Sequence, residues 1–445
     1  MNISRFRALK GFAYDSRTLR KGQAFIAVKG RFQDGHDFIG EADKKGAGLI
    51  VAERLPACRS GRPVKSVSAP VMLVKDSRYA LKILARHVRY LKNPYVYAIT
   101  GSVGKTTTKE MLVWCLKSKH KTCANLKTEN NLFGLSRTIF SLKKEKILVA
   151  ELGTNSPGEI KELAEVLLPN AGLITFVKPV HLEKLKSLPG VFKEKTALLE
   201  SREDTVAVLN ADDEYLRKYK GPAKVYWYGT GKGSGLRARF LSRQKNTVTF
   251  LLNSRYQLCL PISRENFVYN ALAAISAASL SGMTTAQSVK RMNRFRGYPD
   301  GRMDIKKVGA LCFVNDAYNS NPYALKETLK VFKDLAGHKI AVLADMLELG
   351  TGAARYHQAA AKDILCSGVD HCLTLGGLSR HTYEALRRAG FTQARHYATH
   401  SEVSAALKRI VEADPQLSYT VLLKGSRAMH LEKVMELFAK PRSTR

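Results

Sequence analysis

The chain has 445 residues, a length that corresponds to roughly two to four domains. Apolar residues make up 45% of it and charged residues 25%, which is ordinary for a folded globular protein and excludes extensive disorder. Lysine and arginine outnumber aspartate and glutamate by 73 to 38, and the net charge of +35 favours acidic partners such as nucleic acid, anionic lipid or phosphorylated substrates. No apolar run is long enough to span a membrane, and seven scattered cysteines without a CxxC pair exclude a disulfide framework or a zinc knuckle.

The first predicted segment ends near residue 92. Short apolar runs over residues 24–28 and 48–52 predict strands, because turn residues lie between them. A helix is predicted over residues 77–91, where apolar residues recur every three or four positions. Asn93-Pro94 ends this helix.

From residue 95 onward, apolar strands alternate with helical patterns, which is typical of a parallel sheet covered by helices. An alternating stretch over residues 233–262 predicts a β-rich insertion, and residues 266–280 predict an alanine-rich helix. The strands expected in this segment cover residues 95–99, 147–150, 173–177 and 206–209.

The third segment begins near residue 301 and shows the same alternation, with strands expected over residues 311–314, 340–343, 372–375 and 420–423. The predicted fold class is therefore α/β with three domains. They are a small mixed N-terminal domain (1–92), a central parallel-sheet domain (93–300) and a C-terminal Rossmann-like α/β domain (301–445).

The strongest chemical signal is the run T-G-S-V-G-K-T-T-T over residues 100–108, between a predicted strand and a predicted helix. Glycines let backbone N–H groups converge on phosphate oxygens, and the start of a helix adds its positive dipole end. Lys105 would reach the β- and γ-phosphates, and the Thr106 hydroxyl would hold Mg²⁺. The spacing is shorter than the usual G-x-x-x-x-G-K-[ST]. We predict an ATP-binding loop made by Gly101, Ser102, Val103, Gly104, Lys105, Thr106 and Thr107.

T-G-x-x-G-K-T-T at the head of a second domain resembles the Mur ligase family, and the resemblance extends over essentially the whole chain. The run D-A-Y-N-S-N-P over residues 316–322 is similar to the form found in the members that add D-alanyl-D-alanine. The resemblance implies a central P-loop ATPase domain between a domain for a UDP-linked substrate and a C-terminal ligase domain.

In the first domain, Asp15-Ser16-Arg17 and the following K-G-Q-A-F-I-A-V-K-G resemble the family's uridine-nucleotide-binding part. Ser16 offers a hydroxyl, and Arg17 offers a planar cation suited to a phosphate or a base edge. By itself, Asp-Ser-Arg would be read as an ordinary turn.

In the central domain, Asn130 and Asn131 resemble the family's Asn-Asn-x-x-Gly loop and imply substrate contacts. Glu151, after a strand end, looks like its metal-ligating glutamate. His181 corresponds to a histidine at the second metal or the phosphates. Lys195 falls where the family has a lysine carbamylated by CO₂, although Lys193 competes for that assignment.

One departure from the family pattern precedes His181. Position 178 is a lysine where the family usually has a glycine, which would place an extra cation near the phosphates.

Asn270 resembles an adenine-side asparagine, since an amide can pair with N6 and N7 of adenine. Arg302, at the start of the third segment, resembles an arginine that reaches ATP phosphate when the domains close, and Asp316 is expected on the nucleotide side as well. The expected substrate contacts of the third domain are Tyr318, Asn319, Asn321 and Lys424.

The chemistry implied by the resemblance is ATP-dependent amide formation through an acyl phosphate, with release of ADP and phosphate. Two Mg²⁺ ions would clamp the phosphates, one held by Thr106 and Glu151, the other by His181 and a carbamate on Lys195. The catalytic set is Lys105, Glu151, His181, Lys195 and Arg302.

The implied partners are UDP-N-acetylmuramoyl-tripeptide and D-alanyl-D-alanine, with no nucleic acid. The third peptide residue is open between diaminopimelate and lysine. We expect a cytoplasmic monomer, active in peptidoglycan precursor synthesis.

Two other readings fit part of the sequence. Another Mur ligase or a folylpolyglutamate-synthase-like amide ligase would share the phosphate loop, but the Asn-rich run after Asp316 argues against both. A basic nucleic-acid-binding protein on a nucleotide-binding fold would account for the charge of +35. The basic residues are spread along the chain rather than gathered in one tail, so we favour solvated basic faces.

Overall fold

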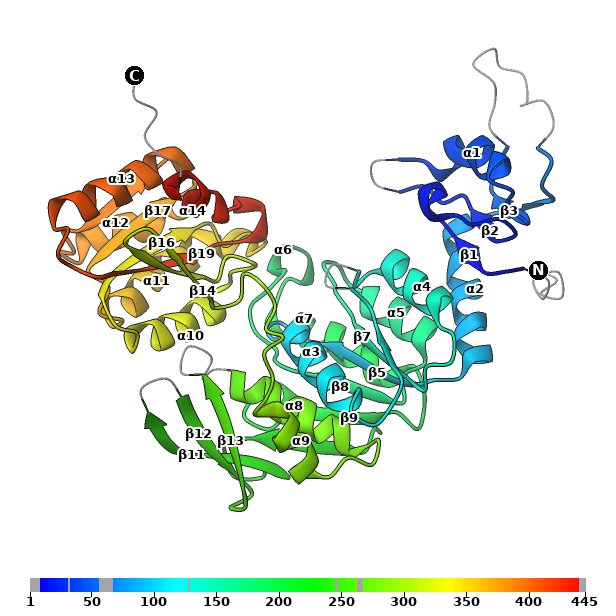
Figure 1. Cartoon of the computed structure of the whole chain (residues 1–445), viewed down its shortest axis with the longest axis horizontal. Helices are drawn as coiled ribbons and strands as arrows, with labels where there is room; N and C mark the ends of the chain where they lie inside the picture. Colours follow the sequence, from blue (N-terminus) through cyan, green and yellow to red (C-terminus); the bar gives the residue numbers. More distant parts are fainter. Residues whose placement is uncertain are drawn as a thin grey trace, which may run out of the picture.

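The computed structural model describes residues 9–30, 33–55, 67–126, 129–244, 247–261 and 267–439. Figure 1 shows three α/β units in chain order, with the N-terminal unit at one end of the molecule and the C-terminal unit at the other. No helix in these ranges is both long enough and apolar enough to cross a membrane.

The N-terminal unit is built on a four-stranded sheet with the order β1-β2-β3-β4 and parallel pairing throughout. Apolar side chains fill both faces of its inner strands, which explains why those strands appear as continuous apolar runs. The elements are β1 (Phe12–Ala13), β2 (Ala24–Ile26), α1 (Ile39–Lys44), β3 (Leu49–Ala52), β4 (Val71–Leu73) and α2 (Ser77–Lys92).

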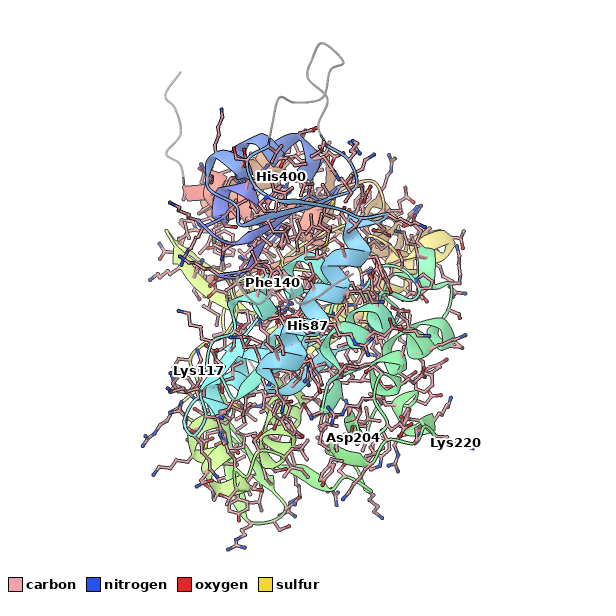
Figure 2. All side chains as sticks on the ribbon, turned by 90° about the vertical axis from the view of Figure 1, so that its right-hand side faces the viewer. His87, Lys117, Phe140, Asp204, Lys220 and His400 are labelled. Carbon is pink, nitrogen blue, oxygen red and sulfur yellow. The ribbon has the colours of Figure 1, made fainter. Side chains whose placement is uncertain are left out.

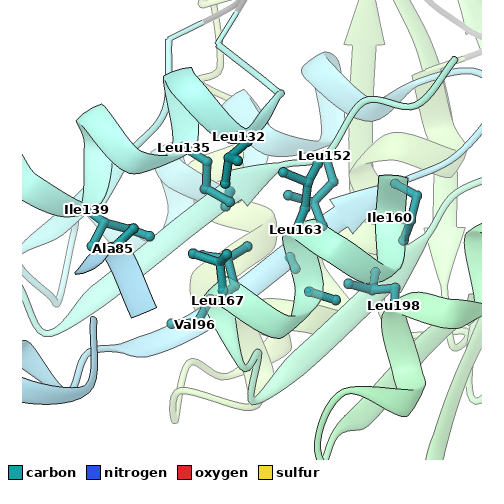
Figure 3. Close-up of a cluster of buried hydrophobic side chains, with 14 of the residues drawn as sticks. Ala85, Val96, Leu132, Leu135, Ile139, Leu152, Ile160, Leu163, Leu167 and Leu198 are labelled. Carbon is teal, nitrogen blue, oxygen red and sulfur yellow. The ribbon is translucent and has the colours of Figure 1, made fainter. Parts of the chain in front are cut away.

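Helix α2 connects the first unit to the second and packs against the central domain (Figure 3). Its buried face joins the cluster that α4 and α5 form beneath the central sheet. Arg89 of α2 donates from Nε to the Leu167 carbonyl (2.5 Å) at the C-terminal end of α5, where a cation meets the negative helix end. Phe140 of α4 lies at the junction below the N-terminal unit, with its ring centroid 4.8 Å from that of Phe12 (Figure 2).

The central domain has a nine-stranded sheet with the order β13-β12-β11-β10-β9-β8-β5-β7-β6. Strands β5 to β10 are parallel, and β11 to β13 form an antiparallel extension, which confirms the expected β-rich insertion. The strands are β5 (Tyr95–Thr100), β6 (Thr122–Ala124), β7 (Ile147–Glu151), β8 (Ala171–Ile174), β9 (Val206–Asn210), β10 (Val225–Gly229), β11 (Leu236–Gln244), β12 (Thr247–Leu252) and β13 (Tyr256–Pro261).

Helices cover both faces of this sheet, as the alternating side chains of β5 demonstrate. Val96 and Ala98 point into the cluster shared with α2, α4 and α5, whereas Tyr97 and Ile99 point into the cluster shared with α3, α8 and α9. The helices are α3 (Lys105–Leu116), α4 (Leu132–Ser141), α5 (Glu159–Leu167), α6 (Leu182–Leu185), α7 (Leu188–Thr196), α8 (Val268–Ser279) and α9 (Thr285–Met292).

The strand expected over residues 173–177 is shifted in the structure, because β8 ends at Ile174. Beyond it the chain leaves the ladder to bond with the phosphate loop. The Ser102 N–H donates to the Phe176 carbonyl (2.8 Å), and the Val177 N–H donates to the Asp213 carboxylate (3.1 Å). Apolar composition alone did not reveal this use of residues 175–178.

The C-terminal domain has a six-stranded sheet with the order β14-β15-β19-β16-β17-β18, in which only the β14–β15 pairing is antiparallel among the described strands. Helices α10 to α12 cover one face, and α13 and α14 cover the other. The elements are β14 (Asp304–Val308), β15 (Leu311–Asn315), α10 (Pro322–Lys333), β16 (His338–Ala344), α11 (Ala353–Leu365), β17 (His371–Leu375), α12 (Arg380–Arg388), β18 (Ala394–Tyr397), α13 (His400–Ala413), β19 (Tyr419–Lys424) and α14 (Glu432–Ala439).

Candidate active site

A cavity of about 480 Å³ lies between the central and C-terminal domains. Loops that follow β5, β7, β8 and β15 line it, so both sheets present the carboxyl ends of their strands to it, the usual ligand position in α/β folds. Of the predicted site residues it is lined by Ser102, Val103, Gly104, Lys105, Thr107, Asn130, Asn131, Glu151, His181, Asn270, Arg302, Asp316, Tyr318, Asn319, Asn321 and Lys424.

The phosphate loop joins β5 to α3 as predicted. Gly101 and Gly104 adopt φ angles of 148° and 87°, which L side chains rarely adopt. Lys105 begins α3 and folds back over the loop, where its Nζ donates to the Gly101 carbonyl (2.7 Å). Its pKa is lowered by burial and by the nearby Arg302 guanidinium, while Glu151 acts in the opposite direction.

Asn270 of α8 supports this loop from behind. Its Nδ2 donates to the Gly104 carbonyl (3.1 Å) and to the Thr108 hydroxyl (3.0 Å). A Cβ at Gly104 would lie only 2.3 Å from that nitrogen, so glycine is required here by contact as well as by φ. The amide hydrogens therefore serve the loop, and a contact of Asn270 with adenine stays a prediction.

Glu151, at the end of β7, presents a partly unsatisfied carboxylate to the cavity. Asn125 fixes its backbone, accepting from the Glu151 N–H (2.8 Å) and donating to its carbonyl (2.9 Å). The Asn130 amide donates to Oε1 (3.3 Å), whereas Oε2 is buried and accepts no hydrogen bond within the described part of the chain. A carboxylate oxygen in this state suits a hard cation.

Lys195 is 1% exposed at the buried side of α7, whereas Lys193 on the same helix is exposed. Burial and the positive charge of Lys105 hold the pKa of Lys195 well below its usual value, with Glu194 acting in the opposite direction. The Glu194 carboxylate is itself bound to the start of α5, accepting from the N–H groups of Gly158 (2.6 Å) and Ile160 (2.8 Å). Of the two lysines considered from sequence, the buried one has its pKa lowered by the charge of Lys105 in the phosphate loop, and it does not line the cavity.

His181 lies on the loop before α6, and its Nδ1 contacts the Glu348 carboxylate of the C-terminal domain. Within the described ranges, no group of three or more His, Cys, Asp or Glu side chains could hold a metal ion on its own. A cation here would therefore need phosphate oxygens or water as further ligands, which is how Mg²⁺ is usually bound.

On the C-terminal side, Asp316 and Lys424 form a buried ion pair (2.8 Å). The Asp316 carboxylate also accepts from the Thr328 hydroxyl (2.6 Å), and Lys424 donates to the Asn319 carbonyl (2.7 Å). Asn321 caps α10 by accepting from the Ala324 N–H (2.9 Å). The predicted residues of this wall are thus brought together, and most of their polar groups bind one another.

Arg302 bridges the two walls. Its guanidinium lies over the Tyr318 ring (4.3 Å to the centroid), and its Nη2 donates to the Thr106 hydroxyl of the phosphate loop (3.2 Å). An arginine of the third segment therefore contacts the phosphate loop, and its contact with ATP phosphate stays a prediction.

Comparison with known proteins gives the family. Three family models match in succession: "Mur ligase family, catalytic domain" over residues 9–89, "Mur ligase middle domain" over 99–278 and "Mur ligase, glutamate ligase domain" over 301–427. A UDP-N-acetylmuramoyl-tripeptide–D-alanyl-D-alanine ligase of Escherichia coli is 30% identical over 95% of this chain and 92% of its own length. The chain belongs to the Mur ligase family.

Further similar proteins cover nearly all of this Mur ligase. The ligase of the same name from Bacillus subtilis is 29% identical over 96% of the chain and 93% of its own length. The crystal structure of MurF from Acinetobacter baumannii superposes with a TM-score of 0.87 at 26% identity, covering 98% of both chains. MurF ligase of Thermotoga maritima in complex with ADP gives 0.83 at 26% identity over 97% of both chains.

Two predicted substrate residues of this Mur ligase lie apart from the cavity, in the N-terminal domain. The Ser16 hydroxyl donates to Glu41 (2.9 Å), and the exposed Arg17 guanidinium pairs with Asp15 (2.8 Å). Neither lines the interdomain cavity.

Several residues that shape the site were given no role from the sequence. Asn125 and Glu194 act through backbone groups of distant loops, and Glu348 meets His181 only because two domains touch. Spacing along the chain offered no signal for such contacts, because each joins segments from different strands or domains.

Proposed function

We propose that this chain is the ATP-dependent ligase that joins D-alanyl-D-alanine to UDP-N-acetylmuramoyl-tripeptide. ATP phosphorylates the terminal carboxylate, ADP leaves, and the amine of the dipeptide displaces phosphate. The observation that carries the proposal is one cavity that holds the phosphate loop on one wall and the D-x-Y-N-x-N-P run on the other. The names of the similar ligases support the same reaction.

The nucleotide occupies the loop after β5, where backbone N–H groups and the start of α3 face its phosphates. Lys105 releases the Gly101 carbonyl and turns to the β- and γ-phosphates. Arg302, already at Thr106, adds a second cation where charge develops during transfer.

Mg²⁺ fits the donors on this wall. The Thr106 hydroxyl and the free Oε2 of Glu151 are hard oxygen ligands, and they would hold the first ion. His181 and a carbamate on Lys195 would hold the second. When bound, the ions neutralise the phosphate oxygens that meet at the cavity.

Carbamylation of Lys195 requires its neutral amine, which adds to CO₂ and loses one proton to give an anionic carbamate. The lowered pKa and nearly complete burial of Lys195 support this chemistry, and the exposed Lys193 lacks both properties. An unmodified ammonium at this position has no acceptor lone pair and repels a cation.

The peptide substrate spans two domains in this proposal. Ser16 and Arg17 bind the uridine nucleotide, Asn130 and Asn131 guide the peptide toward the cavity, and the C-terminal wall receives D-alanyl-D-alanine through Tyr318, Asn319, Asn321 and Lys424. One chain carries every one of these groups, so we propose a monomer. We place it in the cytoplasm, where ATP and UDP-linked precursors are made.

The test is ADP release with each component omitted in turn. ADP and phosphate should form only when UDP-tripeptide, D-alanyl-D-alanine and ATP are all present. Equal turnover with free D-alanine or L-glutamate contradicts the proposed substrate, and AMP with pyrophosphate contradicts the proposed mechanism.

A further inference from the structure

Lys178 stands two residues after Phe176, on the segment where the chain leaves β8. Its backbone carbonyl and N–H are both hydrogen-bonded to the Ser102 side chain of the phosphate loop. The Ser102 hydroxyl donates to the Lys178 carbonyl (3.0 Å) and accepts from the Lys178 N–H (2.9 Å). These two hydrogen bonds fix the Lys178 backbone to the phosphate loop.

The Lys178 ammonium is also fixed in direction. Its Nζ lies 3.0 Å from Oδ2 of Asp213, a residue with no exposed surface. That carboxylate is held in turn by the N–H groups of Val177, Tyr215 and Leu216, each at 3.1 Å. The extra cation expected near the phosphates is thus anchored by the central domain itself.

From this anchor the ammonium faces the C-terminal domain. Its nitrogen lies 5.0 Å from the ring centroid of Tyr323, the second residue of α10, and 5.8 Å from that of Phe176. The Phe176 and Tyr323 rings contact each other at 5.4 Å. A cation within about 6 Å of a ring centroid is attracted by the ring's negative face, and more strongly when water is excluded.

We propose that Phe176, Lys178 and Tyr323 form an interdomain latch, in which Lys178 is a positioning residue. The latch holds the start of α10, and with it Asn319 and Asn321, in a fixed position relative to the phosphate loop. Its catalytic consequence rests on the proposed function, whereas the docking of the domains can be measured without it. Phe176 and Tyr323 line the cavity and the Lys178 side chain is 22% exposed, whereas the side chains of the Arg243–Asp334 ion pair are 34% and 40% exposed.

The first test is small-angle scattering of the unliganded proteins. Tyr323→Leu removes the ring but leaves the Lys178–Asp213 pair in place, so it is not expected to unfold the central domain. It should increase the radius of gyration, whereas Tyr323→Phe, which retains the ring, should not. Arg243→Gln cuts the exposed interdomain pair and serves as the matched control, with no expansion expected. A Tyr323→Leu protein as compact as the wild type overturns the proposal.

The second test is a double-mutant cycle on turnover. Lys178→Met and Tyr323→Leu should each lower kcat by about 5- to 30-fold, the factor that matches a partly desolvated cation–π contact. The double variant should fall well short of the product of the two single effects, because both substitutions remove the ammonium–ring contact, although Lys178→Met also removes the cation from Asp213. ATP affinity, measured by calorimetry without the other substrates, should change by less than about threefold.

Two results contradict the latch. If the two single effects multiply in the double variant, the residues act independently. If Lys178→Met weakens ATP binding more than about tenfold while Tyr323→Leu leaves turnover unchanged, Lys178 contacts the phosphates instead. A wild-type protein without turnover contradicts the proposed function, and the scattering comparison then still decides the latch.

Discussion

On the central-domain wall of the cavity, charged groups keep part of their bonding capacity unused, whereas on the C-terminal wall comparable groups are bonded to one another. Glu151 buries a carboxylate oxygen that has no hydrogen-bond donor in the described structure, whereas Lys195, which does not line the cavity, is buried with a strongly lowered pKa. Across the cavity, Asp316 and Lys424 bind each other as well as Thr328 and the Asn319 carbonyl.

This difference separates groups that would bind a ligand from groups that hold the wall together. Groups held with unused capacity are prepared for a ligand, so replacing them should remove activity and leave the fold intact. Groups bonded to one another set the shape of the wall, so replacing them should lower stability first. Measurements of activity or of stability on variants of each wall can break or sharpen this distinction.

The largest effect is expected from Lys424→Met. It leaves the Asp316 carboxylate, 13% exposed, without its cation, and losing one partner of a buried ion pair costs about 3–5 kcal/mol. Urea unfolding should register this loss. The matched control is Lys330→Met, which removes an exposed pair with Glu327 in the same domain and should cost less than about 0.5 kcal/mol. Equal unfolding curves for the two variants would show that the Asp316–Lys424 pair of the C-terminal wall does not stabilise the domain.

Lys105→Ala should lower turnover by about 10²–10³-fold, the usual cost of removing one group that stabilises transition-state charge. Its thermal midpoint should stay within about 2 °C of the wild type, since the bond to Gly101 is local. Lys117→Ala, at the other end of α3, is the control and should retain activity. Unfolding of Lys105→Ala in place of inactivation would contradict the assignment of this wall.

Lys195→Ala should lower turnover by about 10²-fold, the upper end of what groups supporting a metal contribute. Added acetate should restore part of the activity, because it supplies a carboxylate to the vacated volume. Lys193→Ala, on the exposed side of the same helix, should stay close to the wild type with or without acetate. Inactivation of the Lys193 variant alone would show that Lys193, and not Lys195, is the carbamylated lysine.

The smallest effect concerns pH and the C-terminal domain. Burial lowers the pKa of His357, whose Nε2 accepts from the Met346 N–H (3.0 Å) while Nδ1 donates to the Ala353 carbonyl (2.8 Å). The unfolded chain therefore binds a proton at higher pH than the folded chain, and stability should fall as pH drops below about 6.5.

Unfolding free energies of the wild type and His357→Asn at pH 7.5 and 5.5 measure this contribution. The wild type should lose more stability than the variant over that interval, because only the wild type carries the histidine that the unfolded chain protonates first. Equal losses of unfolding free energy in the two proteins would show that His357 does not contribute to the pH dependence of stability.

Strands buried on both faces were predictable, since a short continuous apolar run such as 311–314 is typical of a core strand, and β15 occupies it. Edge strands were missed for an equally physical reason. β6, β14 and β18 end their sheets and contain mostly polar or half-buried residues, so ladder pairing defines them and composition does not.

The site shows a similar limit. Motif residues on one loop, such as Gly104 and Lys105, were predictable because the loop geometry is local. Contacts such as Lys178 with Tyr323 were not, because they arise only when two sheets turn their carboxyl ends toward one cavity. In each such case the sequence showed the type of residue but did not predict which residue it would contact.

The most direct test of the account follows one oxygen atom through the reaction. UDP-tripeptide labelled with ¹⁸O in its terminal carboxylate is incubated with ATP, D-alanyl-D-alanine and the enzyme, and the products are weighed by mass spectrometry. One ligated product should form for each ADP, and one ¹⁸O should be transferred to the released phosphate. Unlabelled phosphate, or AMP as the nucleotide product, would contradict a cavity built to phosphorylate a carboxylate and deliver it to an amine.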